Sequence, residues 1–359
     1  MKTVNILRDL NLNIVDNYFE VLTPDYIFIP IVDENYIIIK LNTHILKGQL
    51  VYDDNNIKRY SSVSGIALKI GKLNNKKYLI IKNDYKELSI SKRARNVDNI
   101  SKEVFLKYYS NDDIKKILDN KIHTLYINAI DDDPYIYNKY MYLKNNIKDI
   151  SDIINNLLRL FAIERVEFVI KDSYRDLLND YKININYNIV NDIYPIGNDK
   201  LLRKYLINRD DDFLINIEDI LDMVYEVKKN KPILEKYVTI NGNLIDNPSV
   251  INVKKYTYLK EILSKFNIKE KNYSIILNNS LCGKNISLND CIITSDINGV
   301  IINKNNNNVK MECTRCGLCY DVCPVNINPL IKSEKCIKCG LCNYVCPSKI
   351  DVVKEYQDD

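Results

Sequence analysis

One cysteine pattern occurs twice near the carboxyl end of the chain, and it constrains this region more than any other feature of the sequence. The first copy runs from Cys313 to Pro324 and the second from Cys336 to Pro347, and each reads C-x2-C-x2-C-x3-C-P. The two copies hold eight of the ten cysteines.

This spacing is typical of segments that hold two [4Fe–4S] clusters, in which the fourth cysteine of each run ligates the other cluster. It therefore predicts one cluster on Cys313, Cys316, Cys319 and Cys346, and a second on Cys336, Cys339, Cys342 and Cys323. The alternative is structural zinc, but zinc sites use well-separated C-x2-C pairs instead of four cysteines in one short run. Gly317 and Gly340 occupy the same place in each copy, where positive φ would let backbone amides approach the sulfurs.

The bulk composition is that of an ordinary globular protein. The chain has 359 residues, of which 46% are hydrophobic and 27% charged, enough for two to four domains. A net charge of +4 with interspersed signs argues against a nucleic-acid partner. No apolar run reaches the ~18 residues of a membrane span, and the first residues lack the apolar core of a signal peptide. Clustered cysteines then indicate the reducing cytoplasm.

The first predicted domain covers residues 1–75 and consists of short strands. Apolar β-rich runs at 26–32 and 36–40 predict two of them. The pair of motifs Lys47-Gly-Gln-Leu-Val and Ser62-Val-Ser-Gly resembles a lipoyl-type barrel-sandwich fold. In that fold a carrier lysine occupies the hairpin where Lys58 lies, but the residues that flank Lys58 do not match a carrier. We interpret Lys58 as a solvated lysine of the turn.

The second predicted domain covers residues 76–232. It opens with a polar connection that contains the basic run Lys92–Arg95, which we interpret as a solvated face. Apolar runs then predict strands at 124–128, 165–170 and 184–190, with a long helix through Ile147 and Phe161. Alternation of strand and helix indicates a parallel, Rossmann-like sheet. Ligands of such sheets bind at the carboxyl ends of the strands, which makes the segment 128–135 the candidate binding edge. The plainer interpretation of its three aspartates is a solvated loop with a helix cap.

Two further domains complete the prediction. Residues 233–305 alternate apolar residues around Asn241-Gly242, a hairpin signal, and then continue with a short helix and a strand, which suggests a β-grasp, SLBB-like unit. Residues 306–359 form the two-cluster ferredoxin domain. The predicted fold class is therefore multidomain α/β, with a lipoyl-like barrel-sandwich, a Rossmann-like parallel sheet, a β-grasp unit and a ferredoxin-type domain in that order.

This order of parts resembles the RnfC family, the C-type component of the Rnf electron-transport complex, and its relatives, which include an electron-transfer protein associated with proline reductase. The segments that carry the resemblance cover nearly the whole chain: 47–51 with 62–65, 124–128 with 133–135, 216–218, 231–242 and 313–347. The resemblance implies FMN and NADH binding in the Rossmann-like domain, with a glycine-rich loop ahead of its first strand. It maps that site onto Asn128, Asp131, Asp133, Asn216 and Glu218. The region that corresponds to the loop, 105–120, contains no glycine.

We derive two main hypotheses. The first is an electron relay that passes electrons between protein partners through two [4Fe–4S] clusters, with the flavin edge only a vestige. The alternative is an FMN-dependent NADH oxidoreductase subunit that feeds the same clusters without the glycine-rich loop. A third is a structural adapter stiffened by its clusters. The sequence does not decide whether the chain is an enzyme. Partners would be redox proteins, subunits of a membrane electron-transport complex or a reductase, and any contact with the inner face of the membrane would come through them.

Overall fold

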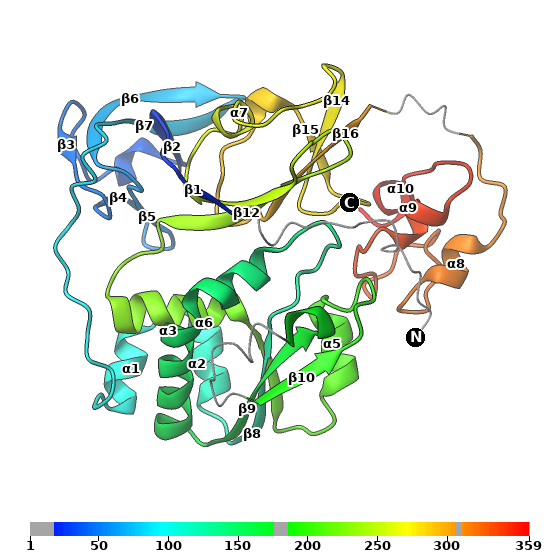
Figure 1. Ribbon diagram of the computed structural model, residues 1–359, viewed down its shortest axis with the longest axis horizontal. Coiled ribbons are helices and arrows are strands. Elements are labelled where there is room, and N and C mark those ends of the chain that lie inside the picture. Colours follow the sequence, from blue (N-terminus) through cyan, green and yellow to red (C-terminus); the bar gives the residue numbers. More distant parts are fainter. Residues whose placement is uncertain (1–17, 176–185, 306–310, 359) are drawn as a thin grey trace.

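The computed structural model describes residues 18–175, 186–305 and 311–358. It combines three sheets and a two-stranded ribbon with helices and ends in a small cysteine-rich unit, so the predicted mixed α/β class is confirmed. The strands of the first sheet and the six-stranded sheet lie above the parallel sheet and its helices, and the cysteine-rich unit sits at one side against both layers (Figure 1). No helix in the described ranges is long and apolar enough to cross a membrane.

The first sheet is antiparallel, with strand order β2-β7-β6-β3, and the ribbon β4-β5 lies beside it. Its strands are β2 Tyr26–Ile31, β3 His44–Ile45, β4 Leu50–Asp53, β5 Lys58–Tyr60, β6 Gly65–Leu73 and β7 Lys76–Asn83. The strand predicted at 26–32 is confirmed. The strand predicted at 36–40 is wrong, because Asp33 caps a 3-10 turn, η2 Glu34–Tyr36, in front of it. The hairpin β6-β7 also carries this sheet past residue 75, to Asn83.

The second sheet is parallel, with strand order β10-β9-β8-β11. Its strands are β8 Ile122–Asn128, β9 Ile163–Lys171, β10 Asn186–Val190 and β11 Asp212–Asn216. The helices and turns of this region are α1 Lys102–Tyr108, α2 Asp112–Leu118, α3 Asn138–Leu160, η3 Asp172–Tyr174, α5 Asp199–Leu206, α6 Ile217–Met223 and the π-helical η4 Val224–Lys229. The long helix through Ile147 is confirmed, and its apolar positions share one core with β8 and β9. Residues 184 and 185 of the third predicted strand lie outside the described residues.

The third sheet has six strands in the order β1-β13-β12-β16-β14-β15. Its elements are β1 Tyr18–Leu22, β12 Glu235–Asn241, β13 Ser249–Lys254, α7 Leu259–Leu263, β14 Tyr273–Leu277, β15 Lys284–Ile286, η5 Leu288–Asp290 and β16 Gly299–Lys304. The hairpin predicted around Asn241-Gly242 is confirmed, since β12 and β13 pair in antiparallel. Strand β1, from the amino-terminal end, pairs with β13 in this sheet and not with the first sheet.

A ring of four charges joins the first sheet region to the third sheet. The Lys47 Nζ lies 2.6 Å from a Glu87 oxygen and 3.3 Å from a Glu235 oxygen, and the Lys254 Nζ lies 3.0 Å and 3.1 Å from oxygens of the same two residues. The Lys254 side chain is 3% exposed. Alternating signs leave no ion of the ring unpaired, which is what makes burial of Lys254 tolerable.

Gly242 ends β12 in a conformation that only glycine adopts readily. Its φ is +124°, and a Cβ there would lie 2.1 Å from the Ile302 carbonyl oxygen. We therefore expect Gly242→Ala to lower the free energy of unfolding by about 2–5 kcal/mol, through strain and overpacking. Urea unfolding followed by circular dichroism measures this.

Gly71→Ala is the matched control for this variant. At Gly71 the added Cβ would meet only the tip of the Ile80 side chain, at 2.7 Å, and φ is not positive. The control should stay within about 1 kcal/mol of the parent. An equal loss of unfolding free energy in Gly242→Ala and Gly71→Ala would contradict the strain and overpacking that we assign to Gly242.

Candidate iron–sulfur centre and sheet edge

The two cysteine repeats share one backbone conformation. Residues at three equivalent positions of each copy have positive φ: Arg315 and Lys338, Gly317 and Gly340, Asn326 and Lys349. Short helices then follow at equivalent places, α8 Leu318–Val322 and α9 Leu341–Val345, and α10 Val352–Tyr356 closes the unit. Where a residue with left-handed backbone conformation follows one with right-handed conformation, successive N–H groups point toward the same side. The concavity that they form, called a nest, binds anionic groups in many Fe–S sites.

The eight cysteines surround two cavities, four around each. A cavity of about 290 Å³ is lined by Cys313, Cys316, Cys319 and Cys346. A smaller one of about 20 Å³ is lined by Cys323, Cys336, Cys339 and Cys342. In the described part of the chain no three His, Cys, Asp or Glu side chains converge closely enough to hold a single metal ion. Four thiols placed around a cavity are instead the arrangement that a cubane needs, with a thiolate at each iron.

The second set of cysteines lies under a loop of the third sheet, residues 278–283. The Gly340 backbone approaches this loop so closely that a Cβ would lie 2.6 Å from the Leu281 Cβ and 3.1 Å from the Cys282 sulfur. The Asn343 side chain donates to the Leu281 carbonyl at 3.0 Å, and the Tyr194 hydroxyl donates to the Cys339 carbonyl. These contacts attach the cysteine-rich unit to the rest of the protein.

The two sets therefore differ in exposure although their sequences repeat. Cys313 and Cys316 are exposed, whereas Cys323 and Cys342 are buried. Burial raises the pKa of Cys339 to about 11 and that of Cys342 to about 12. The equivalent glycine of the first copy, Gly317, has nothing within 4 Å of its Cβ position. One set faces solvent and the other faces the interior.

Four of the five predicted sheet-edge residues lie together at the carboxyl ends of the parallel strands. Asn128 and Asn216 are register partners at the ends of β8 and β11. Both donate from Nδ2 to the Asp199 carboxylate, at 2.8 Å and 2.9 Å. The Asn128 Oδ1 accepts from the Ile130 amide, and the Asn216 Oδ1 accepts from the Lys139 ammonium. The polar atoms of both side chains are thus engaged within the chain.

Asp131 and Asp133 are also bound within the protein. Asp131 accepts from the Lys139 amide at 3.0 Å and so caps α3, whose own N-cap residue, Tyr137, makes no side-chain cap. Asp133 is 2% exposed; it accepts from the Tyr135 amide and from both the amide and the hydroxyl of Ser280, at 2.7 Å and 2.8 Å. Burial raises the pKa of both carboxyls, that of Asp131 to about 7.

Glu218 is the exception among the five. Its Oε2 is buried without a hydrogen-bond partner among the described residues. The residue lines a cavity of about 360 Å³ between α3, α6 and β12. Near this cavity, the segment that corresponds to the glycine-rich loop forms α1 and α2, and the Ser110 amide and hydroxyl between them bind the Glu226 carboxylate at 2.7 Å and 2.8 Å.

Sequence reasoning missed the residues that attach the cysteine-rich unit, namely Tyr194, Leu281, Cys282 and Asn343. The Cys282 thiol donates to the Lys338 carbonyl at 2.9 Å and packs beside Cys342. Cys291 is a buried core residue. Only Asn343 lies inside a recognisable motif; nothing local in the sequence distinguishes Tyr194. His44 and His123 pair with Asp84 and Asp212, respectively.

Residues 309–327 and 336–350 each match a family described as a 4Fe-4S binding domain. The chain thus carries two iron–sulfur segments. It is also similar to the C component of the ion-translocating oxidoreductase complex of Buchnera aphidicola subsp. Acyrthosiphon pisum, with 25% identity, covering 85% of this chain and 74% of the relative. The C component of the proton-translocating ferredoxin:NAD(+) oxidoreductase complex of Clostridium ljungdahlii is 22% identical, over 60% of this chain and 51% of the relative. The predicted resemblance to the RnfC family is confirmed.

Another such C component, from Buchnera aphidicola subsp. Baizongia pistaciae, is 23% identical, and the match covers 58% of this chain and 46% of that protein. The chain therefore spans about half the length of two of these three relatives. Among solved structures, the crystal structure of NAD+-reducing [NiFe]-hydrogenase in the H2-reduced state matches 52% of this chain and 41% of that chain, with 10% identity and a TM-score of 0.42.

Gly340→Ala and Gly317→Ala test the packing of the second cysteine set. Both residues have positive φ, so both variants carry about 1–2 kcal/mol of backbone strain. Only the Gly340 variant also collides with Leu281, so we expect it alone to displace loop 278–283 and lower the iron content after anaerobic reconstitution. Iron analysis and limited proteolysis measure the difference. Equal behaviour of the two variants would contradict this packing.

Asp131 predicts a pH dependence of stability. Its folded pKa of about 7 exceeds the ordinary value of 3.8, so between these values the folded protein binds a proton that the unfolded chain does not. Stability from this group is therefore present at low pH and is lost as pH rises toward 7. Asp131→Asn can still accept from the Lys139 amide and should flatten this fall, measured as urea midpoints from pH 5 to 8. An unchanged slope would contradict the prediction.

Proposed function

We propose that this protein is an iron–sulfur electron-transfer subunit that relays electrons between protein partners through two [4Fe–4S] clusters. The observation that carries the proposal is the sorting of eight cysteines around two cavities, with the fourth cysteine of each run facing the cavity of the other. The two matches to 4Fe-4S binding domains support it independently. Clusters of this kind supply one-electron transfer without atom transfer, which suits a chain whose sheet edge is filled by its own side chains.

We assign Cys313, Cys316, Cys319 and Cys346 as ligands of one cluster, and Cys336, Cys339, Cys342 and Cys323 as ligands of the other. The first would be the exchange point with a redox partner, because Cys313 and Cys316 are exposed. Leu318 and Tyr320 line the same cavity and are 45% and 50% exposed, an apolar rim that suits transient docking. The second cluster would lie inside, beneath loop 278–283.

The finer division of the fold is part of this proposal. The first sheet with its ribbon would be the lipoyl-like barrel-sandwich, the parallel sheet the Rossmann-like domain and the six-stranded sheet the β-grasp, SLBB-like domain. The parallel pairing of β12 with β16 and the position of α7 between β13 and β14 support the last assignment. Relatives named as components of ion-translocating complexes support redox partners within a membrane-associated complex, to which this chain would bind from the cytoplasmic side through those partners.

The alternative is an NADH oxidoreductase subunit with FMN at the sheet edge. The unpartnered Glu218 carboxylate oxygen beside the 360 Å³ cavity favours it. Against it, the polar atoms of Asn128, Asp131, Asp133 and Asn216 are bound within the chain, and helices α1 and α2 occupy the place of the glycine-rich loop. Close backbone approach to a phosphate needs residues without a Cβ.

Anaerobic purification followed by iron, sulfide and flavin analysis separates the two functions. The relay predicts about eight irons per chain, no flavin and no bleaching of the clusters by NADH. Stoichiometric FMN with NADH-dependent bleaching would establish the alternative. Absence of iron after reconstitution would overturn both.

Cysteine variants test the ligand assignment. We expect Cys316→Ser and Cys342→Ser each to reduce iron to about four per chain, because each removes one ligand from a different cluster. Cys291→Ala, which removes a buried core cysteine outside the repeats, should retain about eight irons. Electron paramagnetic resonance of the reduced protein should show a different cluster remaining in each serine variant. Loss of the same signal in both would contradict the assignment.

A further inference from the structure

The two cysteine cavities have walls of different chemistry, although the repeats that form them share one backbone conformation. The polar residues Thr314, Asn328 and Ser348 line the first cavity, and Arg315 is the one charged residue among the described residues of its wall. The described residues that line the second cavity, apart from its four cysteines, are all aliphatic, glycine or proline. The first set therefore has a polar surrounding with one cation, and the second set has an apolar surrounding.

One cation occupies the same place in each repeat, directly before the second cysteine, yet only one of the two is neutralised. The Lys338 Nζ lies 2.6 Å from the Asp358 carboxylate, and Lys338 does not line the second cavity. Arg315 of the first repeat is exposed and forms no ion pair with a described residue. The charge of Arg315 therefore acts on the first cavity without a counter-charge.

A carboxylate without a cationic partner lies beside the second set. Asp351 accepts a hydrogen bond of 2.7 Å from the side chain of Asn343, the residue that directly follows Cys342. Asp351 also accepts from the Lys354 backbone amide, and no described ammonium or guanidinium group pairs with it. Negative charge at this place opposes the addition of further negative charge at the second set.

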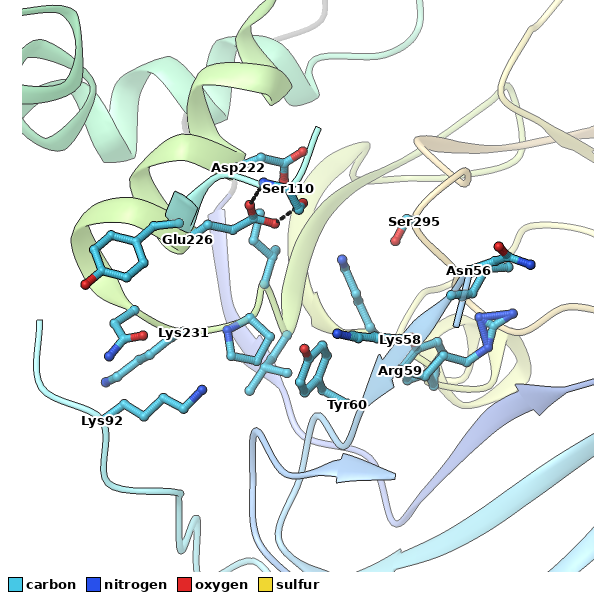
Figure 2. Close-up of a pocket in the computed structure, with 18 of the residues that line it drawn as sticks. Asn56, Lys58, Arg59, Tyr60, Lys92, Ser110, Asp222, Glu226, Lys231 and Ser295 are labelled. Carbon is cyan, nitrogen blue, oxygen red and sulfur yellow. Dashed lines mark hydrogen bonds between the residues drawn. The ribbon is translucent and has the colours of Figure 1, made fainter. Parts of the chain in front are cut away.

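A cavity of about 660 Å³ gathers further cations, and it belongs to neither cysteine set. Figure 2 shows Lys92 and Lys231 on one side of this cavity and Lys58 and Arg59 on the other. None of the described residues that line it also lines a cysteine cavity. These cations are thus no part of the immediate surroundings of either set, and Lys231 offers a control for a change of charge.

A reduced cluster needs a surrounding that tolerates additional negative charge. Reduction adds one electron to a centre that four thiolates already make anionic, with no bond formed or broken. A nearby cation and access to water stabilise the added charge, whereas an apolar wall and a carboxylate destabilise it. Arg315 and the exposure of Cys313 and Cys316 thus favour reduction at the first set, and the apolar wall beneath loop 278–283 disfavours it at the second.

We propose that Arg315 and loop 278–283 separate the reduction potentials of the two sets, so that a single electron on this chain resides at the first set. The inference rests on the proposed relay function, in which a reduced redox protein supplies that electron and is itself oxidised. At the first set the electron lies beneath the exposed rim of Leu318 and Tyr320, where the next partner can accept it. The two repeats, alike in their ligands, would then have different roles.

Potentiometric titration of the iron-loaded full chain with dithionite, followed by electron paramagnetic resonance, tests the proposal. We expect two separate one-electron steps, with at least a tenfold difference in the reduced-to-oxidised ratio at a fixed potential, which corresponds to ~59 mV. The higher step should persist in Cys342→Ser, which retains the first set, and the lower step in Cys316→Ser. Coincident steps in the parent, or the reverse assignment in the serine variants, would overturn the proposal.

Arg315→Gln tests the contribution of the cation. Without the guanidinium the higher midpoint should fall, with a reduced-to-oxidised ratio about three- to tenfold smaller at a fixed potential, while the lower midpoint stays unchanged. Lys231→Gln removes a cation of the cavity in Figure 2 and should leave both midpoints at their parent values. Both side chains are exposed, so folding and iron content should be unchanged. An unchanged higher midpoint in Arg315→Gln, or an equal fall in Lys231→Gln, would overturn the role of Arg315.

Leu281→Ala tests the contribution of the loop. Leu281 packs against the buried cluster that contains Leu341, as Cys339 also does, so its truncation opens the second set to water and should raise the lower midpoint alone. Leu288→Ala truncates another partly buried leucine, which packs on the core of the six-stranded sheet, and should leave both midpoints unchanged. Equal shifts in the two leucine variants would contradict the role of the loop.

Iron analysis of the same samples separates this inference from the proposed function. About eight irons in the parent with coincident midpoints would overturn the inference and leave the cluster assignment standing. Absence of iron from the reconstituted parent would overturn the relay itself. If Leu281→Ala loses iron, the comparison of Arg315→Gln with Lys231→Gln decides, because these exposed positions do not support the fold.

Discussion

The arrangement of this protein depends on one buried carboxylate. Asp133, in the loop after β8, binds the amide and hydroxyl of Ser280 and thereby fixes the loop that covers the second set of cysteines. The same loop after β8 is attached to β12, where the Tyr137 amide donates to the Thr239 hydroxyl and the Asn241 side chain donates to the Tyr135 carbonyl. A charge that is 2% exposed is costly unless several donors satisfy it. Three donors do so here, and the two on Ser280 connect the parallel sheet to the loop of the six-stranded sheet that in turn contacts the cysteine-rich unit.

This junction breaks the equivalence of the two cysteine repeats. Their backbones match down to the positions of positive φ, yet one repeat packs against Leu281, Cys282 and Tyr194 while the other faces solvent. Burial and hydrogen bonding around a cluster set its potential, so two centres with the same ligands need not be equivalent. In the relay that we propose, an exposed cysteine set next to a buried one would give an electron path with an outer end at a partner and an inner end in this chain.

Sequence reasoning predicted the parallel strands and the long helix well, because their apolar periodicity is local and strong: β8, β9 and α3 lie where it placed them. The strand that it predicted at 36–40 was wrong. Asp33 caps a 3-10 turn at Glu34–Tyr36, and the apolar residues of the turn and beyond it look like a strand in the sequence. The resemblance placed Asn128, Asp131, Asp133, Asn216 and Glu218 at one site, and the first four have their hydrogen bonds at the strand ends. It could not show that their hydrogen bonds are already made within the chain, since Asp199, Lys139 and Ser280 come from three other segments.

The sequence by itself determined the two sets of four cysteines, and with them the prediction of two [4Fe–4S] clusters, because the spacing of cluster ligands is set within a dozen residues. It likewise determined the resemblance to the RnfC family, because the order of motifs along the chain carries it. Only the tertiary structure decided which cysteine set is buried, how the sheet edge is filled and that Lys58, Lys92 and Lys231 surround one cavity. These features depend on contacts between distant segments, such as Asp133 with Ser280, 147 residues apart, and no local pattern encodes which distant surfaces will meet.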